Sequence, residues 1–420
     1  MRLPKEFLIG ASTAAHQVEG NNIHSDYWMM EQLEGTSFKE RSGIAVDHYN
    51  RFKQDIQFMA ELGLNAYRFS IEWARIEPEE GRFDEKEVAH YHNVLQACHD
   101  NGITPIVTLH HFTSPQWLIT AGGWRSSETP ARFAKYCEFI MSELGELIPY
   151  VCTINEANMP LALTKIMKKY QASSGVAQIG INTEVQRNRE KYKAQMAEAF
   201  RISADEVHVF LSPMTSADIG LIFQAHTEAR QAIRRVSPST KVGITLSLYD
   251  IQALPGGEAL AEEAMHEEFL QFLPYLTEDD FFGLQNYTRM IYGPDGPLAV
   301  PESAEKTQMG NEYYPQALEA VIRYASKHLS IPIIVTENGV ATDQDERRIA
   351  FIDTALHGIQ ACLDEGIQVL GYMHWSLLDN FEWQLGYSKR FGLIEVNWET
   401  QERIPKPSAY HLGSIAKQIQ

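Results

Sequence analysis

The sequence predicts a single (β/α)₈ barrel with elaborated βα loops, and two observations carry this expectation. Short β-rich runs alternate with longer amphipathic runs along all 420 residues, without a linker rich in Pro, Gly or Ser. Several of the short runs are continuously apolar, as strands of a parallel sheet are when both faces are buried. We therefore expect residues 1–420 to form one barrel domain.

Eight short runs have the length and composition of strands. Each is rich in β-branched, aromatic or other apolar residues. In order, they are Phe7–Gly10, Ala66–Ser70, Thr104–His111, Tyr150–Asn155, Val242–Ser247, Phe281–Asn286, Ile333–Thr336 and Val369–Trp375. The alternative is an open doubly wound sheet, but no glycine-rich phosphate loop follows the first run.

Amphipathic stretches between these strands are long enough to serve as crossover helices. They are Tyr49–Leu62, Glu87–Asn101, Pro130–Leu147, Ile219–Val236, Pro315–His328 and Arg347–Glu365. The segment 160–218 is patterned differently, because basic and acidic residues alternate there over a weak helical pattern. We expect it to be a βα-loop elaboration with helical content.

The charge balance limits the classes of partner. Lys and Arg number 36 against 55 Asp and Glu, a formal charge of −19, which repels nucleic acid and anionic lipid. A neutral small-molecule substrate fits better. The first ten residues lack a signal-peptide core, and no run approaches the roughly 18 apolar residues of a membrane span.

The four cysteines lie far apart in apolar runs and lack the spacing of a metal site. We expect them to be reduced core residues of a cytoplasmic protein. No metal is expected, because none of the histidines belongs to an H-E-x-x-H or similar ligand set. No cofactor is expected either.

Two glutamates stand where the predicted strands end, which is where barrels of this type carry their chemistry. Glu156 follows the fourth strand and Glu337 the seventh. One glutamate alone could equally be a structural ion-pair partner. Two facing one pocket form the arrangement that glycosidic cleavage needs, since one donates a proton to the leaving oxygen while the other attacks, or guides attack on, the anomeric carbon.

Neighbouring residues suggest which glutamate does which. A nucleophile must be ionised, and the cation of Arg68 with the hydroxyl of Tyr287 would favour the charged form of Glu337. Glu156 must hold a proton when substrate binds, which calls for an apolar or negatively charged setting. Once Glu337 is consumed in a covalent intermediate, its repulsion disappears and Glu156 can act as a base.

Three long segments resemble glycoside hydrolase family 1, the β-glucosidase family: residues 7–20 (FLIGASTAAHQVEG), 333–341 (IIVTENGVA) and 375–383 (WSLLDNFEW). The resemblance runs over nearly the whole chain. It implies a (β/α)₈ barrel and retention of anomeric configuration, with Glu337 as nucleophile and Glu156 as acid/base. It also implies that Arg68 and Tyr287 hold Glu337.

The resemblance further implies a set of sugar-binding residues. Hydrogen bonds to the nonreducing sugar would come from Gln17, His111, Asn155, Glu382 and Trp383, with Trp375 as the stacking floor and Phe391 as an edge contact. Amides, an imidazole and carboxylates around aromatic planes suit a sugar, because it presents hydroxyls around apolar C–H faces.

The sequence departs from the family pattern at several positions. Ala157 stands where the family usually has Pro, and Phe112, which lacks an indole donor, where it usually has Trp. Gln285-Asn286 stand where Asn-Tyr is common, so Gln285 would have to reach further to support Glu337.

The expected substrate is an unphosphorylated β-D-glucoside or oligosaccharide, with β-galactosides and β-fucosides as further possibilities. Members that take 6-phosphorylated sugars generally have a small hydroxyl residue where Glu382 stands, so a 6-phospho-β-glycosidase is disfavoured. A transglycosylase using the same intermediate remains an alternative. A non-catalytic sugar-binding protein is disfavoured because both glutamates are present. The chain could be a monomer or a homo-oligomer.

Overall fold

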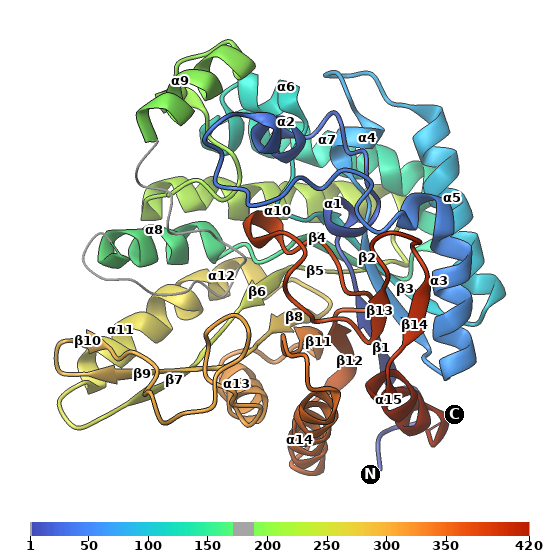
Figure 1. Cartoon of the computed structure of the whole chain (residues 1–420), viewed down its shortest axis with the longest axis vertical. Helices are drawn as coiled ribbons and strands as arrows, with labels where there is room; N and C mark the ends of the chain where they lie inside the picture. Colours follow the sequence, from blue (N-terminus) through green and yellow to red (C-terminus); the bar gives the residue numbers. More distant parts are fainter. Residues whose placement is uncertain (1, 171–188, 420) are drawn as a thin grey trace.

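One parallel sheet closes around the centre of the molecule in the computed structural model, which describes residues 2–170 and 189–419 (Figure 1). Its strand order is β5-β4-β3-β2-β1-β12-β11-β8-β6. The strands are β1 (Leu8–Ser12), β2 (Ala66–Ser70), β3 (Thr104–His110), β4 (Tyr150–Ile154), β5 (Lys241–Gly243), β6 (Thr245–Ser247), β8 (Phe282–Gln285), β11 (Ile333–Asn338) and β12 (Val369–Trp375).

The barrel closes through β5 and β6, which are two halves of one run interrupted at Ile244. β5 pairs with β4, and β6 pairs with β8 at the other end of the strand order. This division corrects the prediction of one continuous strand over Val242–Ser247. Strands of a closed barrel tilt and twist, so one strand can change its hydrogen-bonding partner along its length. With the two halves counted together, the predicted eight-stranded barrel is confirmed.

The end of β11 differs from the prediction in a way that matters for the site. β11 continues past Thr336 to Asn338, so Glu337 lies within the strand and not after it. Its pairing with β12 and with β8 is irregular there, with shifts of register between Val335 and the last residues. Such an irregularity re-aims side chains at the rim of a barrel.

Helices pack around the outside of the barrel, as Figure 1 shows for α3, α5, α14 and α15. Each of the six predicted helices is present within a few residues of its expected bounds. Two further outer helices, α11 and α15, were not predicted. The sequence of α11 has little apolar periodicity, since only Ala261 and Ala264 of it are buried. The outer helices are α3 (His48–Leu62), α5 (Glu85–Asp100), α7 (Thr129–Leu144), α10 (Ser216–Val236), α11 (Glu258–Glu268), α13 (Ala317–Ser326), α14 (Asp345–Asp364) and α15 (Pro407–Lys417).

Shorter elements build the loops. Helical content is present on both sides of residues 171–188, which belong to the predicted loop elaboration 160–218 but lie outside the described residues. The remaining helices are α1 (Ala15–Val18), α2 (Asp26–Gln32), α4 (Trp73–Ile76), α6 (Gln116–Thr120), α8 (Met159–Tyr170), α9 (Arg189–Phe200), α12 (Leu273–Leu276) and the 3₁₀ helices η1 (Gly123–Arg125), η2 (Gly145–Leu147), η3 (Ala204–Glu206), η4 (Leu270–Phe272) and η5 (Trp383–Leu385). The outlying strands are β7 (Asp250–Ala253), β9 (Arg289–Gly293), β10 (Gly296–Pro297), β13 (Ile394–Val396) and β14 (Arg403–Pro405).

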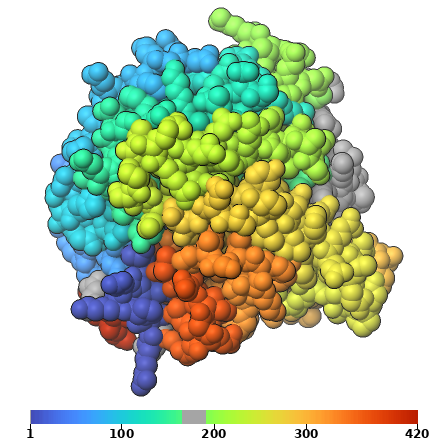
Figure 2. Space-filling view, turned by 180° about the vertical axis from the view of Figure 1, so that it is seen from behind, coloured from blue at the N-terminus to red at the C-terminus, as the bar shows by residue number. Residues whose placement is uncertain are grey.

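The inside of the barrel holds a small apolar cluster of its own. Ala66 belongs to it, and Arg68, two residues further along β2, points to the same side of the strand. Seen from behind, segments that follow one another in sequence lie side by side around the molecule (Figure 2). The interior cluster consists of Ala66, Ile106, Cys152, Phe281, Ile334 and Met373.

Candidate active site

Three donors, one from β2 and two from the end of β8 and the residues just after it, hold the Glu337 carboxylate. Arg68 Nη1 lies 2.5 Å from Oε1, Gln285 Nε2 donates to the same oxygen at 2.9 Å, and the Tyr287 hydroxyl donates to Oε2 at 2.6 Å. Burial raises the pKa of Glu337 overall, and the charge of Arg68 and the hydrogen bonds of Tyr287 and Arg68 offset that rise only in part. The sequence predicted the lowering groups but not the desolvation that opposes them.

Glu156 lies just after β4 in a different setting. Its backbone has φ of 44°, in the left-handed region that non-glycine residues seldom adopt, and its amide donates to Thr245 Oγ1 at 2.9 Å. Burial raises the pKa of the Glu156 carboxyl well above its usual range, and the negative charge of Glu337 raises it further. The two environments therefore give the two carboxyls different pKa values. Glu156 has the more strongly raised pKa and holds its proton more tightly.

Asn155 connects Arg68 with the imidazole of His111. Its Oδ1 accepts from Arg68 Nη2 at 2.6 Å and from Gln285 Nε2 at 2.7 Å. Its Nδ2 therefore faces His111 Nε2, 3.1 Å away, and must be the donor. Burial lowers the pKa of His111 well below its usual range, so the ring is neutral and carries its proton on Nδ1, which is buried without a partner among the described residues.

Gln17 of α1 lies against the segment that follows β12. Its Nε2 donates to the Phe381 carbonyl at 2.8 Å and reaches Asn380 Oδ1 at 3.2 Å and Glu382 Oε2 at 3.4 Å. Its Oε1 is buried without a partner among the described residues. The first βα loop and the last one thus meet at the site, although Gln17 and Glu382 are far apart in the sequence.

Aromatic rings form the walls of the cavity. His111 stacks on Trp375 and on Trp383, with ring centroids 5.8 and 5.9 Å apart, and Phe391 makes an edge contact with Tyr287 at 6.2 Å. One cavity is lined by both glutamates and eight further residues: His111, Phe112, Asn155, Tyr287, Trp375, Glu382, Trp383 and Phe391. Of the predicted site residues, only Arg68, Gln285 and Gln17 do not line it, and each of them contacts a residue that does.

Strained backbone gathers at this cavity. Phe112, Glu156 and Trp383 all line it and all have positive φ, at 68°, 44° and 46°. Positive φ in such residues costs about 1–3 kcal/mol and persists only where the surroundings enforce it.

Sequence reasoning missed two hydroxyl residues of β6. Thr245 contacts the Glu156 amide and Asn155 Oδ1, and Ser247 lies buried at the end of the strand. Ser247 stands at the carboxyl end of the strand and Thr245 two residues before it, which was a usable signal, but small hydroxyl residues are too common there to be singled out from the sequence.

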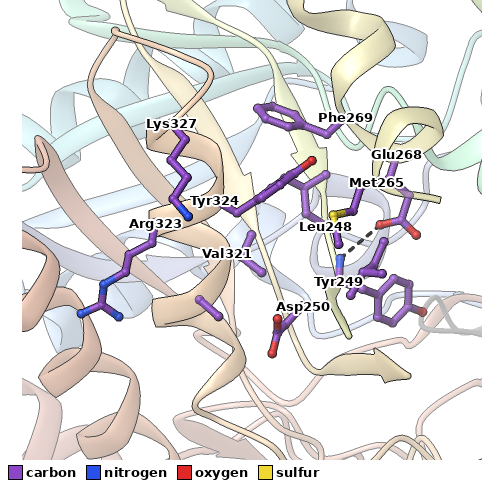
Figure 3. Close-up of a pocket in the computed structure, with 12 residues that line it drawn as sticks. Leu248, Tyr249, Asp250, Met265, Glu268, Phe269, Val321, Arg323, Tyr324 and Lys327 are labelled. Atoms are coloured by element: carbon purple, nitrogen blue, oxygen red, sulfur yellow. Dashed lines mark hydrogen bonds between the residues drawn. The ribbon is translucent and has the colours of Figure 1, made fainter. Parts of the chain in front are cut away.

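A roomier cavity lies outside the barrel, between β7, α11 and α13 (Figure 3). Its volume is about 350 Å³, and its lining contains neither Glu156 nor Glu337. Tyr249, Asp250 and Glu268 lie on one side of it, with Arg323 and Lys327 on the other. The smaller cavity is the candidate active site, because only that one brings the two glutamates together.

Neither a metal centre nor a membrane-spanning helix is found in the described ranges. No group of three or more His, Cys, Asp or Glu side chains there could hold a metal ion. In the same ranges, no helix combines the length and the apolar character needed to cross a bilayer.

A parallel (β/α)₈ barrel with two buried glutamates and a wall of aromatic and amide side chains at the carboxyl ends of its strands has the architecture of a glycoside hydrolase. The model of the family described as "Glycosyl hydrolase family 1" matches residues 1–272 and 278–420. The chain belongs to this family and is a glycoside hydrolase. The resemblance inferred from the three motifs is confirmed.

Named relatives agree with this assignment. The chain is 31% identical to "Beta-glucosidase A" of Thermotoga maritima, over 99% of this chain and 98% of that protein. Its fold is similar to a crystal structure of β-glycosidase BGL167, with a TM-score of 0.91 and 46% identity over 99% and 97% of the two chains. A structure of Thermotoga maritima β-glucosidase with methoxycarbonyl-substituted glucoimidazole gives a TM-score of 0.81 and 26% identity, covering 99% and 98%.

Proposed function

We propose that the protein is a retaining exo-β-glycosidase for unphosphorylated β-D-glucosides, with Glu337 as nucleophile and Glu156 as general acid/base. The observation that carries this proposal is the unequal treatment of two glutamates in one cavity. Glu337 is held by a guanidinium and a phenol, whereas burial and the negative charge of Glu337 raise the pKa of Glu156 well above its usual range, which favours its protonated form. The proposal requires the two carboxyls to stand about 5 Å apart.

The proposed reaction has two displacements. In the first, a Glu337 oxygen bonds to the anomeric carbon, the bond from that carbon to the leaving oxygen breaks, and Glu156 gives its proton to that oxygen. In the second, Glu156 takes a proton from water, the water oxygen bonds to the anomeric carbon, and the bond to Glu337 breaks. Neutralising Glu337 in the intermediate removes the charge that raises the pKa of Glu156, which lets Glu156 act as the base.

The sugar contacts belong to the same proposal. Gln17, His111, Asn155, Glu382 and Trp383 would bind the hydroxyls. Trp375 would lie under the ring and Phe391 at its edge. The buried, unpartnered polar atoms of Gln17 and His111 support this assignment, since a sugar hydroxyl would give each of them a partner.

The preference for an unphosphorylated glycone rests on Glu382. Its side chain is buried, lines the cavity and contacts Gln17 Nε2, so a sugar 6-phosphate in this region would meet a carboxylate. The names of the relatives point the same way, since they are called β-glucosidases and β-glycosidases.

Two substitutions test the roles of the glutamates. Glu337→Ala should lower hydrolysis of an activated aryl β-glucoside by about 10⁴-fold or more, and azide should partly restore turnover and give the α-glycosyl azide.

Glu156→Ala should slow alkyl glucosides by about 10²- to 10⁴-fold and activated aryl glucosides much less, because a good leaving group needs little proton help. The control is Glu399→Ala, which removes an exposed glutamate. Equal losses of Glu156→Ala on both substrates would contradict the acid assignment.

A panel of nitrophenyl β-glycosides tests the substrate class. Gluco, galacto, fuco, xylo, manno and 6-phosphogluco substrates are compared by kcat/KM. We expect the glucoside to lead, galactosides and fucosides to follow, and the 6-phosphoglucoside to be inert. Preferential cleavage of the 6-phosphoglucoside would contradict the inference that the Glu382 carboxylate excludes a phosphorylated sugar.

We also propose a cytoplasmic location. All four cysteines, Cys98, Cys137, Cys152 and Cys362, are buried free thiols, as expected for a protein folded in a reducing compartment. Cell fractionation with an activity assay tests this location, and activity confined to an extracellular fraction would contradict it.

A further inference from the structure

Two hydroxyl side chains of β6 stand beneath Glu156, although Glu156 belongs to the end of β4. Thr245 and Ser247 are two residues apart, so they share one face of the strand. Both are buried, with exposed fractions of 0% and 5%. β6 pairs with β8 in a register that sets Thr245 opposite Gly283 and Ser247 opposite Gln285.

The Thr245 hydroxyl uses its full hydrogen-bonding capacity on this site. It accepts from the Glu156 amide at 2.9 Å and from Gln285 Nε2 at 3.2 Å, and it donates to Asn155 Oδ1 at 3.3 Å. The Thr245 carbonyl accepts from the Ala157 amide at 3.0 Å. Thr245 thus holds the backbone on both sides of the strained Glu156, whose φ is 44°.

Hydrogen bonds connect the Thr245 hydroxyl to the surroundings of both glutamates. Asn155 and Gln285, which contact Thr245 Oγ1, also contact Arg68 and Glu337. A displacement of Thr245 would therefore reach Glu156 through its backbone and Glu337 through its donors.

Ser247 is fixed from both sides by one amide side chain. Asn158 Oδ1 accepts from the Ser247 amide at 3.1 Å, and Asn158 Nδ2 donates to the Ser247 carbonyl at 2.8 Å. The Ser247 hydroxyl is buried and has no partner at full hydrogen-bond geometry among the described residues. Because Asn158 follows Glu156 by two residues, its two hydrogen bonds hold Ser247 beside the segment that carries Glu156. A hydrogen bond donated by the Ser247 hydroxyl lowers the pKa of the Glu156 carboxyl.

We propose that Thr245 and Ser247 are positioning residues for Glu156, Thr245 by fixing its backbone and Ser247 by donating to its carboxylate when it acts as base. This inference rests on the proposed role of Glu156. A hydroxyl next to Glu156 favours its ionised form, which the second displacement requires. A fixed backbone keeps the carboxyl in reach of the leaving oxygen, which the first displacement requires.

The test of Thr245 compares Thr245→Val, Thr245→Ser and Thr240→Val on an activated aryl glucoside and an alkyl glucoside. Thr245→Val should lower kcat/KM about tenfold to a hundredfold on the alkyl glucoside and less on the aryl one, because only the former needs the proton. Thr245→Ser should recover most of the loss. Thr240 is the matched control: it is buried just before β5, where its hydroxyl donates to the Ile148 carbonyl.

The test of Ser247 is the pH profile. Ser247→Ala removes a donor to the ionised Glu156 carboxyl and should raise its pKa, so the alkaline limb of the kcat/KM profile should move to higher pH.

Two outcomes would overturn the proposal. One is a Thr245→Val variant that matches Thr240→Val on both substrates, and the other is an alkaline limb of Ser247→Ala that coincides with that of the wild type. Failure of the proposed function looks different, because Glu156→Ala would then itself lack leaving-group dependence.

Discussion

Glu156 and Glu337 show how neighbours decide the chemistry of identical side chains. Both are almost fully buried, so desolvation raises the pKa of each. Arg68 and Tyr287 offset part of that rise at Glu337, whereas the charge of Glu337 adds to the rise at Glu156. The difference between the two pKa values therefore depends on Glu337 being ionised while Glu156 is protonated.

This dependence gives a prediction at the residue scale. Glu337→Gln removes the negative charge and should lower the pKa of Glu156. The measurement is a ¹³C NMR titration of labelled glutamate side chains, with Glu156→Gln to identify the signal. Glu382→Gln is the matched control: its charge raises the pKa of Glu156 less than the charge of Glu337 does, so the decrease should be smaller. An unchanged or higher pKa in Glu337→Gln would show that the two carboxyls do not interact.

The ends of β11 and β12 illustrate how two strands place a catalytic side chain. Gly339 follows β11 directly, and a Cβ atom there would lie 1.9 Å from the Trp375 carbonyl oxygen. Only glycine lets the two chains approach this closely. Because Glu337 precedes Gly339 by two residues and Trp375 lines the cavity, this contact sets the shape of the site.

At the element scale we therefore expect Gly339→Ala to lower the free energy of unfolding by about 1–3 kcal/mol through overpacking, and to reduce kcat by moving Glu337 or Trp375. Differential scanning calorimetry and kinetics measure the two effects. Gly220→Ala is the matched control, since Gly220 lies inside α10 and a Cβ atom there would meet no other atom within 4 Å. Alanine there should be neutral or slightly stabilising. A Gly339→Ala variant that behaved like Gly220→Ala would contradict the packing argument.

A buried ion pair joins β14, near the C-terminus, to α3. Arg403 of β14 donates to Asp55 of α3 at 2.7 and 2.9 Å, and neither side chain is exposed. His48 lies 2.7 Å from the same carboxylate. This contact fastens the C-terminal strands to the first outer helix.

The prediction at the scale of the whole molecule concerns Asp55→Asn, which should lower the free energy of unfolding by about 3–5 kcal/mol by leaving Arg403 buried without its counter-charge. Burial alone would raise the pKa of Asp55, but the hydrogen bonds and charges of Arg403 and His48 lower it overall. A lowered pKa adds stability above the unfolded value, so the advantage of the wild type should shrink as the pH falls below 3.8.

Denaturant unfolding of both proteins from neutral to acid pH checks this expectation. Glu79→Gln is the control, since Glu79 belongs to an exposed ion pair with Arg82 and should change little. A stability difference between wild type and Asp55→Asn that grew toward low pH would contradict the assignment.

Much of the architecture was predictable because apolar runs and their spacing are local properties of a chain. The runs Ala66–Ser70 and Val369–Trp375 are strands with the expected bounds, and the six expected helices are present. The site residues were found through strand ends and long motifs, so their gathering around one cavity was also expected. Their catalytic and binding roles remain predictions.

The sequence by itself determined the fold class, the family and the positions from which the candidate site residues come. Only the tertiary structure decided that the strand Val242–Ser247 divides at Ile244, and that Thr245 supports Glu156 across 89 residues of chain. The physical reason is closure. A strand reveals itself through its own side chains, but its neighbours at the seam of a barrel depend on how far all the other strands tilt.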